Sequence, residues 1–185
     1  MLVHEILFAL WLFWSAGVAT LIPVLAAHAP GMRAWSAPMD GGKTWRGRRI
    51  LGDHKTWRGF LAGWIGGSLW GLVQVAIYNH STFVQNFYPE SFPVDKFLVT
   101  TVLISLGAVV GDAVGSFCKR QLDIPSGKSW FPYDQLDFIL GGIILSLILV
   151  RLHLSQYLVI IGVWLGVHLL FGVLGYLTHL KEEII

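Results

Sequence analysis

The chain has 185 residues, of which 55% are hydrophobic and 13% are charged, and its formal net charge is +2. A soluble domain has about 25% charged residues, so this composition excludes an ordinary soluble protein and indicates an integral membrane protein. A lone cysteine, Cys118, excludes an intrachain disulfide and a cysteine-rich metal site, and we expect no nucleic-acid partner.

Five apolar segments are long enough to cross a bilayer, which takes about 20 residues. They lie at residues 6–26, 60–78, 94–117, 134–150 and 156–178. The first has no basic stretch before it and exceeds the apolar core of a signal peptide, about 7–15 residues, so we expect it to be retained as a span. The fourth is short and has to begin near Tyr133 to reach across. The sequence therefore predicts an all-α fold, in which residues 1–185 form one polytopic membrane bundle of five transmembrane helices.

Lysine and arginine gather on one side of these spans. Of the 13 such residues, eleven lie in loop 27–59, loop 118–133 and the tail at Lys181, whereas Lys96 and Arg151 lie on the other side. Cytoplasmic loops carry an excess of these residues. We therefore expect a multi-pass protein of the cell membrane with its N-terminus outside, its C-terminus in the cytoplasm, and both polar loops facing the cytoplasm.

Loop 27–59 contains the pentapeptide K-T-W-R-G twice, at residues 43–47 and 55–59. The stretch 41–44, G-G-K-T, is not a P-loop, because Ala37 stands where that motif needs glycine and no strand precedes it. Glycine, lysine and threonine can still bind an anion. The alternative is a basic loop that grips anionic lipid headgroups through its arginines and tryptophans. We favour phosphate binding for the second copy, within residues 52–59, because it adjoins a span.

Glycines recur at four-residue spacing on three of the predicted spans. Small residues at this spacing allow helices to approach closely. We expect this packing mostly within one bundle, and a homodimer stays possible. The glycines are Gly59, Gly63, Gly67 and Gly71, then Gly107, Gly111 and Gly115, then Gly162 and Gly166.

An acid lies inside the third span, where a charge at the bilayer centre costs about 2.5–3.5 kcal/mol and usually has a function. Asp112 is seven residues before Lys119, so about 10 Å below the cytoplasmic end of that helix. Ser105, Asp112, Ser116 and Lys119 share one helical face. The alternative role is an acid paired with a loop arginine for packing alone.

Two more acids, Asp134 and Asp137, open the fourth span at i and i+3, so they share a face. Capping the helix would need one acid only. Three carboxylates without thiolates or clustered imidazoles suit a hard cation such as Mg²⁺. Lys119 and Arg120 beside them suggest a polyphosphate, or serve as the cytoplasmic anchor of the span.

Two stretches together resemble the archaeal CDP-archaeol synthases, a family related to the CDP-diacylglycerol synthases. They are "GDHKTWRG", residues 52–59, and "GDAVGSFCKRQLDIPSGKSWFPYDQLDF", residues 111–138. In the bacterial and eukaryotic relatives a serine, a Lys-Arg pair and a final Asp-Arg-x-Asp recur. Here Ser116, the pair at 119–120 and the stretch D-Q-L-D at 134–137 correspond, with Gln135 in place of the arginine.

The resemblance implies that CTP and 2,3-bis-O-(geranylgeranyl)glycerol 1-phosphate give the CDP-activated ether lipid and pyrophosphate, with Mg²⁺. By position, the metal would be held by Asp112, Asp134 and Asp137, which with Lys119 form the expected catalytic set. The expected contacts to CTP and its phosphates are Lys43, Asp53, His54, Lys55, Thr56, Arg58, Ser116, Lys119 and Arg120.

Two other functions fit parts of the pattern. A CTP-dependent kinase of a polyprenol-type lipid would also need metal and cations, and in addition a base for a hydroxyl group, for which His54 is the candidate. An ion or solute transporter could use Asp112 as its coupling site. Against the transporter, the outer half of the spans carries no acid except Asp95, and the spans show no repeat.

Overall fold

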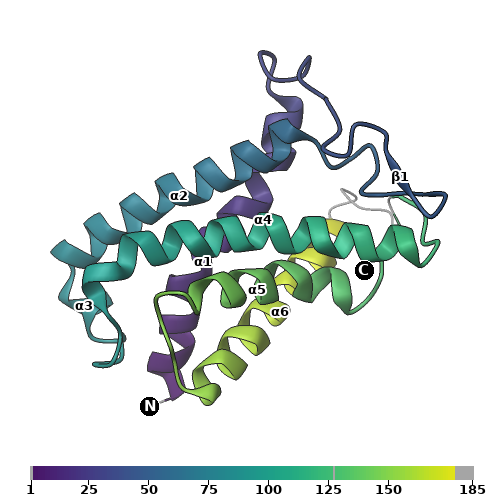
Figure 1. Cartoon of the computed structure of the whole chain (residues 1–185). Helices are drawn as coiled ribbons and strands as arrows, with labels where there is room; N and C mark the ends of the chain where they lie inside the picture. The colour runs from purple at the N-terminus through teal and green to yellow at the C-terminus, as the bar shows by residue number, and fades with distance from the viewer. Residues whose placement is uncertain (1, 127, 178–185) are drawn as a thin grey trace.

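The computed structural model describes residues 2–126 and 128–177 and is almost entirely helical (Figure 1). Lys181 and the last residue of the predicted fifth span lie outside the described residues. The elements in chain order are α1 (Leu2–His28), β1 (Thr44–Trp45), β2 (Arg48–Arg49), α2 (Trp57–His80), α3 (Thr82–Gln85), the 3₁₀ helix η1 (Val94–Lys96), α4 (Phe97–Gln121), α5 (Tyr133–Ser146) and α6 (Leu154–Leu177).

Within the described residues, four helices are long and apolar enough to cross a membrane: Leu2–His28, Trp57–His80, Val94–Gln121 and Leu154–Leu174. They cover the predicted spans 6–26, 60–78, 94–117 and most of 156–178. The prediction for 134–150 is not confirmed as a regular spanning helix. α5 has 14 residues, which make a helix about 21 Å long at 1.5 Å per residue.

Side chains at the start of α6 explain why the chain after α5 need not be helical. The Tyr157 hydroxyl accepts a hydrogen bond from Leu152 N at 3.0 Å and donates to Val150 O at 3.3 Å. The Gln156 side chain accepts from His153 N at 3.0 Å. Backbone groups that leave a helix inside a membrane protein need such partners. These bonds supply them, and α5 can therefore end at Ser146.

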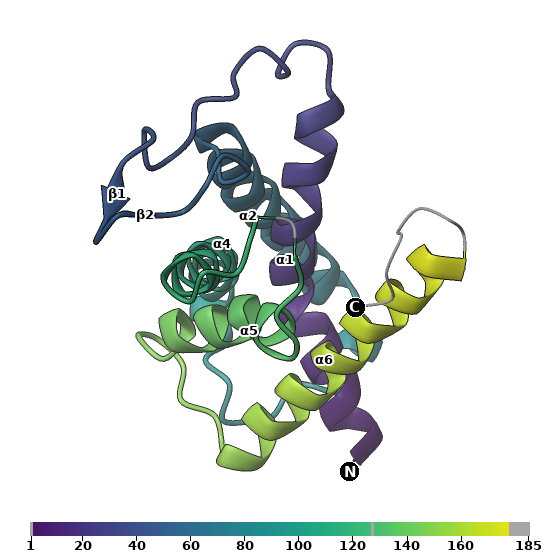
Figure 2. The ribbon, with the colours of Figure 1, turned by 90° about the vertical axis from the view of Figure 1, so that its right-hand side faces the viewer.

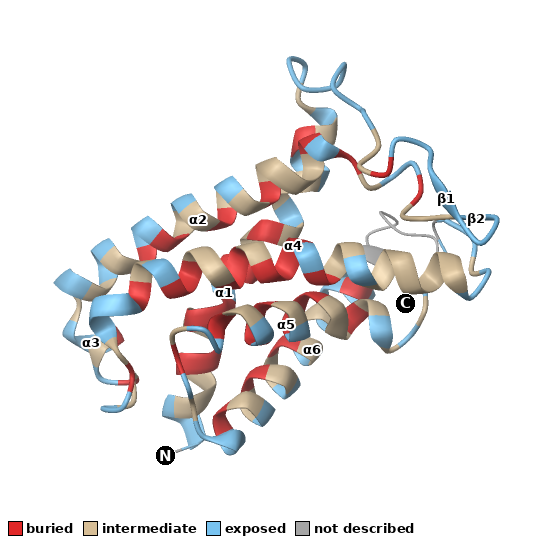
Figure 3. Cartoon of the chain, in the orientation of Figure 1, coloured by how far each residue is buried: buried red, intermediate tan, exposed pale blue. Residues whose placement is uncertain are grey.

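α1 lies at the centre of the bundle and packs against α2, α4 and α6. Its residues Phe8, Leu12, Phe13 and Ala16 are at most 1% exposed, and the buried residues of the helices face inward in Figure 3. Large apolar side chains also cover the outside of the long helices; they include Ile65, Leu69, Leu158 and Phe171. Such a surface suits lipid and would be unfavourable in water.

The glycine spacing serves packing within the chain on two helices. A methyl group added at Gly107 or Gly111 of α4 would collide with the backbone of α5, at the Gly141 or Asp137 carbonyl. On α2, one added at Gly63 would collide with the backbone of α1. Gly162 and Gly166 of α6 differ, since nothing within the described chain lies within 4 Å of a methyl group added there.

The two copies of K-T-W-R-G take different conformations, and the first modifies the all-α prediction. Its Thr44-Trp45 forms β1, which pairs antiparallel with β2 through a two-residue turn. Arg46 and Gly47 in that turn have φ angles of 52° and 79°, the left-handed region that a tight hairpin turn of this kind requires. In the second copy, Thr56 instead caps α2 by accepting a hydrogen bond from Gly59 N at 3.2 Å.

β1 and β2 form a ribbon that packs against the C-terminal end of α4 (Figure 2), the end that we expect to face the cytoplasm. Arg48 donates to Gln121 O and pairs with Asp123, and the Trp45 ring lies 5.5 Å from that of Phe117. Figure 2 also shows α5 between α4 and α6. The ribbon, the end of α4 and the start of α5 thus surround one end of the bundle.

Candidate functional site

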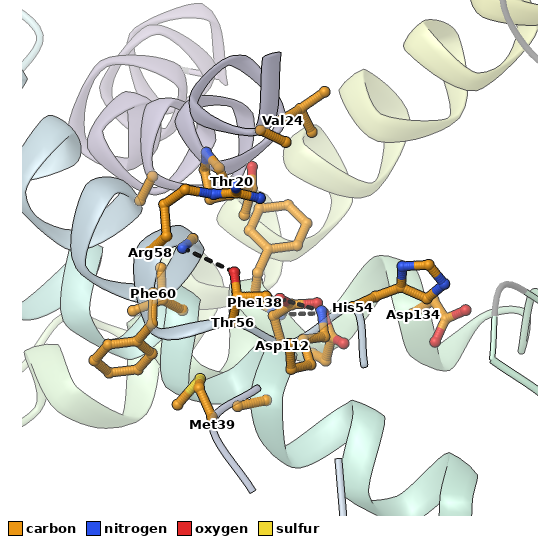
Figure 4. A pocket seen from close by; sticks show the side chains of 18 of the residues that line it. Thr20, Val24, Met39, His54, Thr56, Arg58, Phe60, Asp112, Asp134 and Phe138 are labelled. Carbon is orange, nitrogen blue, oxygen red and sulfur yellow. Dashed lines mark hydrogen bonds and ion pairs between the residues drawn. The ribbon is translucent and has the colours of Figure 1, made fainter. Parts of the chain in front are cut away.

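A cavity of about 680 Å³ opens at this end of the bundle. It is bounded by α1, α2, α4, α5 and α6 and by the loop before α2 (Figure 4). One part of its wall is polar, with side chains from both predicted motifs: Asp53, His54, Lys55, Thr56, Arg58, Asp112, Asp134 and Asp137. The structure therefore brings the two stretches, 59 residues apart at Asp53 and Asp112, to one cavity.

Two lysines neutralise two of the three predicted acids. Lys55 Nζ lies 2.5 Å from Asp112 Oδ2, and Lys119 Nζ lies 2.7 Å from Asp134 Oδ2. Both pairs are only partly exposed, with 13–45% of each side chain accessible. Lys55 comes from the second copy of the pentapeptide and Asp112 from the third long helix. This ion pair is thus the direct link between the two motifs.

Asp137 lies deeper and has no lysine or arginine partner among the described residues. Its Oδ1 accepts from Phe138 N at 2.6 Å. The side chains of Asp112, Asp134 and Lys55 lie close enough for their charges to act on this carboxyl group. Gly115 of α4 leaves room for this carboxylate, since a methyl group there would collide with it. Three carboxylates with two cations make a charged centre around the cavity.

These residues fit a hard divalent cation by chemistry, because all three acids offer carboxylate oxygens and none of the set is a thiolate. The described residues contain no group of three His, Cys, Asp or Glu side chains already arranged to hold a metal ion. Two of the three carboxylates instead form ion pairs with lysine ammonium groups. Metal binding through all three acids would therefore require their side chains to move from the positions they have here.

Other residues of the predicted site take different roles. Arg58 lines the cavity, yet it donates to Met32 O and Arg33 O at 3.0 and 3.3 Å and so holds the loop after α1 to the start of α2. Lys43 is exposed on the loop, away from the cavity lining. Ser116 and Arg120 are not part of the lining either.

The predicted polar face of α4 is only partly continuous with the cavity. Asp112 lines it, and Lys119 reaches it through Asp134. Ser105 is fully buried and donates to Thr101 O at 2.8 Å and to Ser15 O at 3.5 Å. It therefore belongs to the contact between α1 and α4 and not to the charged centre.

Sequence reasoning missed Asp40, which lies just before the ribbon. Its carboxylate accepts hydrogen bonds from the Arg49 guanidinium and from the backbone N–H groups of Gly42, Leu51 and Gly52, at 2.9–3.3 Å. Burial opposes its ionisation, but these hydrogen bonds outweigh burial and hold the pKa of Asp40 well below its usual range. The carboxylate is therefore charged at neutral pH, and its stabilising effect is complete above the ordinary pKa of an aspartate and is lost progressively as the pH falls from there through the lowered pKa.

Sequence reasoning also missed the apolar wall of the cavity and one histidine. Ala19, Pro23 and Val24 of α1 line the cavity beside Phe138. His168 of α6 completes this wall, and its ring lies 5.8 Å from that of Phe138. The cavity thus joins a charged end to an apolar side that reaches between the helices.

Comparisons with known proteins agree with the family resemblance found in the sequence. Residues 2–184 match the family model described as CarS-like: CDP-archaeol synthase. A CDP-archaeol synthase of Pyrococcus furiosus is 35% identical over 180 residues, which cover 97% of this chain and 98% of that protein. The one of Methanocaldococcus jannaschii is 33% identical over 92% of this chain and 98% of its own length.

A solved structure also resembles the chain, with a TM-score of 0.74 and 32% sequence identity. The similarity covers 91% of this chain and 94% of the other. That structure is described as an intramembrane enzyme for archaeal membrane lipid biosynthesis.

Proposed function

The chain belongs to the CDP-archaeol synthase family, and we propose that it transfers a cytidylyl group from CTP to an ether-linked archaeal phosphatidic acid. The products are CDP-archaeol and pyrophosphate. The observation that carries this proposal is one cavity, in which a charged wall of Lys55, Asp112, Asp134 and Asp137 meets an apolar wall, with Lys119 paired to Asp134 behind it. A charged nucleotide and a lipid phosphate need such a combination.

The reaction requires no strong base in the protein. The lipid phosphate monoester, with a second pKa of about 6, is largely ionised at neutral pH. One of its oxygens attacks the α-phosphorus of CTP and forms the new P–O bond. The bond from that phosphorus to the α,β-bridging oxygen breaks, and pyrophosphate leaves with the electron pair. The described cavity lining accordingly needs to supply position and positive charge, rather than an activated nucleophile.

The chain's own residues divide this work. Lys55 and Lys119 lie where their ammonium groups can neutralise phosphate oxygens. His54 and Thr56 flank Lys55 in the cavity lining and would contact the nucleotide. Asp112, Asp134 and Asp137 would hold Mg²⁺, which when bound supplies further charge neutralisation on the triphosphate.

The apolar side of the cavity suits the glycerol end of the lipid. Ala19, Pro23 and Val24 lie on α1, and Val24 is 56% exposed on the outer surface. A lipid phosphate could therefore reach the charged centre while its chains stay among the helices and the bilayer. The charge distribution of the loops supports a cytoplasmic position for the centre, where CTP is available.

We further propose that the chain crosses the membrane five times. In this topology α5 together with the irregular residues 147–153 makes the fourth crossing, with the N-terminus outside and the C-terminus in the cytoplasm. The support is that the segment between α5 and α6 lies at the end of the bundle away from the ribbon in Figure 1, and that the backbone of residues 150–153 has hydrogen-bond partners.

The test is label transfer from α-³²P CTP. Purified protein in detergent receives the labelled CTP, Mg²⁺ and unsaturated archaetidic acid. We expect label in the organic phase and an equal amount of pyrophosphate in the aqueous phase. CDP formed with a polyprenol acceptor, and no labelled lipid, would move the chain to the kinase class. The absence of CTP turnover with either acceptor would contradict both nucleotide-dependent reactions.

A further inference from the structure

The Asp40 carboxylate ties together the two ends of the ribbon. Its side chain is fully buried (0% exposed). On one side it accepts from Gly42 N at 3.0 Å, where the chain enters the ribbon. On the other it accepts from Leu51 N and Gly52 N at 2.9 and 3.0 Å, where the chain leaves the ribbon. The ribbon is thus a loop closed at its base by one carboxylate.

The residues that directly follow this closed base, from Asp53 on, line the cavity. Lys55 follows Gly52 by three positions, and its backbone oxygen accepts from Met39 N, beside Asp40, at 2.8 Å. Arg49, bound to Asp40 at 3.0 Å, also pairs with Asp53 at 2.8 Å. The backbone that carries Lys55 is therefore fixed from two sides by Asp40 and its neighbours.

We propose that Asp40 is a positioning residue for the nucleotide side of the cavity and acts through Lys55. This inference rests on the proposed function. Without the carboxylate, the partly buried N–H group of Leu51 and the buried N–H group of Gly52 lose their acceptor, and unpaired buried donors are costly. The segment from Leu51 to Lys55 then has to change its path. The ammonium group of Lys55 loses its fixed place beside Asp112, although Asp40 itself is not part of the cavity lining.

A double-mutant cycle tests this mechanism. In the label-transfer assay, and in a direct measurement of CTP binding, we compare wild type, Asp40→Ala, Lys55→Ala and the double variant. Asp40→Ala should raise the KM and the Kd for CTP about tenfold and leave the KM for the lipid within about twofold. The double variant should be no worse than Lys55→Ala alone, since residues that act as a unit are not additive.

Other outcomes would overturn the proposal. If the effects of the two single substitutions multiply, Asp40 does not act through Lys55. An unchanged KM for CTP in Asp40→Ala, or equal increases for CTP and lipid, would have the same consequence. In each of these cases a wild type that still labels the lipid leaves the proposed function intact. A wild type without labelled lipid would instead contradict the proposed function itself.

A second measurement keeps folding apart from positioning. Hydrogen exchange, measured without CTP, should become faster at residues 51–57 in Asp40→Ala and stay unchanged in the middle of α4. The matched control is Asp123→Asn, which removes the negative charge that pairs with Arg48 at the other side of the ribbon, where the Asp123 side chain is 66% exposed. We expect this control to leave residues 51–57 and the KM for CTP unchanged. Unaltered exchange at 51–57 in Asp40→Ala would contradict the proposal.

Discussion

The deepest acid of the charged centre gives the sharpest test at the scale of single residues. Asp137→Asn keeps the shape of the side chain and removes a carboxylate oxygen that would hold the metal, so the bundle should stay folded while label transfer falls by at least about 100-fold. Asp95→Asn, an exposed aspartate in η1 at the opposite end of α4, is the control and should keep the wild-type rate. Near-normal turnover by Asp137→Asn with Mg²⁺ would refute a role of this carboxylate in binding the metal.

The two copies of the pentapeptide provide a matched pair of lysines. Lys55 pairs with Asp112 in the cavity, whereas Lys43 lies on the exposed loop. A hydrogen bond to a charged group contributes about 1.5–3 kcal/mol, so Lys55→Ala should raise the KM for CTP by about 10–100-fold. Lys43→Ala should change it by less than about twofold. If both substitutions change the KM for CTP equally in steady-state assays, the alternative role, binding of anionic lipid headgroups, would apply to both copies.

The sequence predicts the acids that line the candidate cavity better than it predicts the residues that hold the surrounding chain in place. Asp112, Asp134 and Asp137 stand out because charges are costly in apolar segments, whatever the fold. Asp40 does not stand out, because a loop aspartate is ordinary until the chain folds around it. His168 is similarly hidden, since only the packing of α6 against α5 brings it beside Phe138. Residues whose role depends on distant contacts leave no local pattern.

At the scale of elements, the contact between α4 and α5 depends on glycine. Gly111→Ala would place a methyl group against the Asp137 carbonyl, and overpacking of this kind costs about 1–3 kcal/mol. We expect a thermal midpoint several degrees lower in detergent, together with reduced activity, because the same contact positions Asp137. The matched control is Gly162→Ala on α6, where nothing described lies within 4 Å.

The control should leave the thermal midpoint unchanged or slightly raised, since alanine favours a helix over glycine. A thermal scan in which both variants behave alike would show that the close approach of α4 and α5 does not limit stability. Four-residue glycine spacing predicts close helix contacts on α2 and α4 correctly. It does not reveal that the same spacing on α6 meets no neighbour within the described chain.

Composition predicts helices reliably here but not where they end. The apolar run at 134–150 continues past Ser146, yet α5 stops there because Tyr157 and Gln156 satisfy the following backbone. These partners lie on the next helix and have no signature in the run itself. The two conformations of K-T-W-R-G show the same limit. Identical residues form a hairpin in one place and a helix cap in the other, according to what surrounds them.

At the scale of the whole molecule, the proposed topology predicts which loops face which side of the membrane. Three exposed serines mark the loops: Ser91 before η1, Ser129 between α4 and α5, and Ser155 in the first turn of α6. Each is replaced singly by cysteine in a Cys118→Ser background, so that each variant carries one thiol. The variants are treated with a membrane-impermeant maleimide in right-side-out vesicles, before and after permeabilisation.

Ser91→Cys and Ser155→Cys should react in sealed vesicles, and Ser129→Cys only after permeabilisation, because the basic loops stay on the cytoplasmic side. The reactivity of Ser155→Cys tells whether α5 and the residues after it cross the bilayer. If it reacts from outside, α5 and residues 147–153 together cross the bilayer, although α5 alone is about 21 Å long. If it reacts only from inside while Ser91 reacts from outside, α5 enters and returns, and the chain crosses three times before α6. The reverse pattern at Ser91 and Ser129 would place the charged cavity away from the cytoplasm and its CTP.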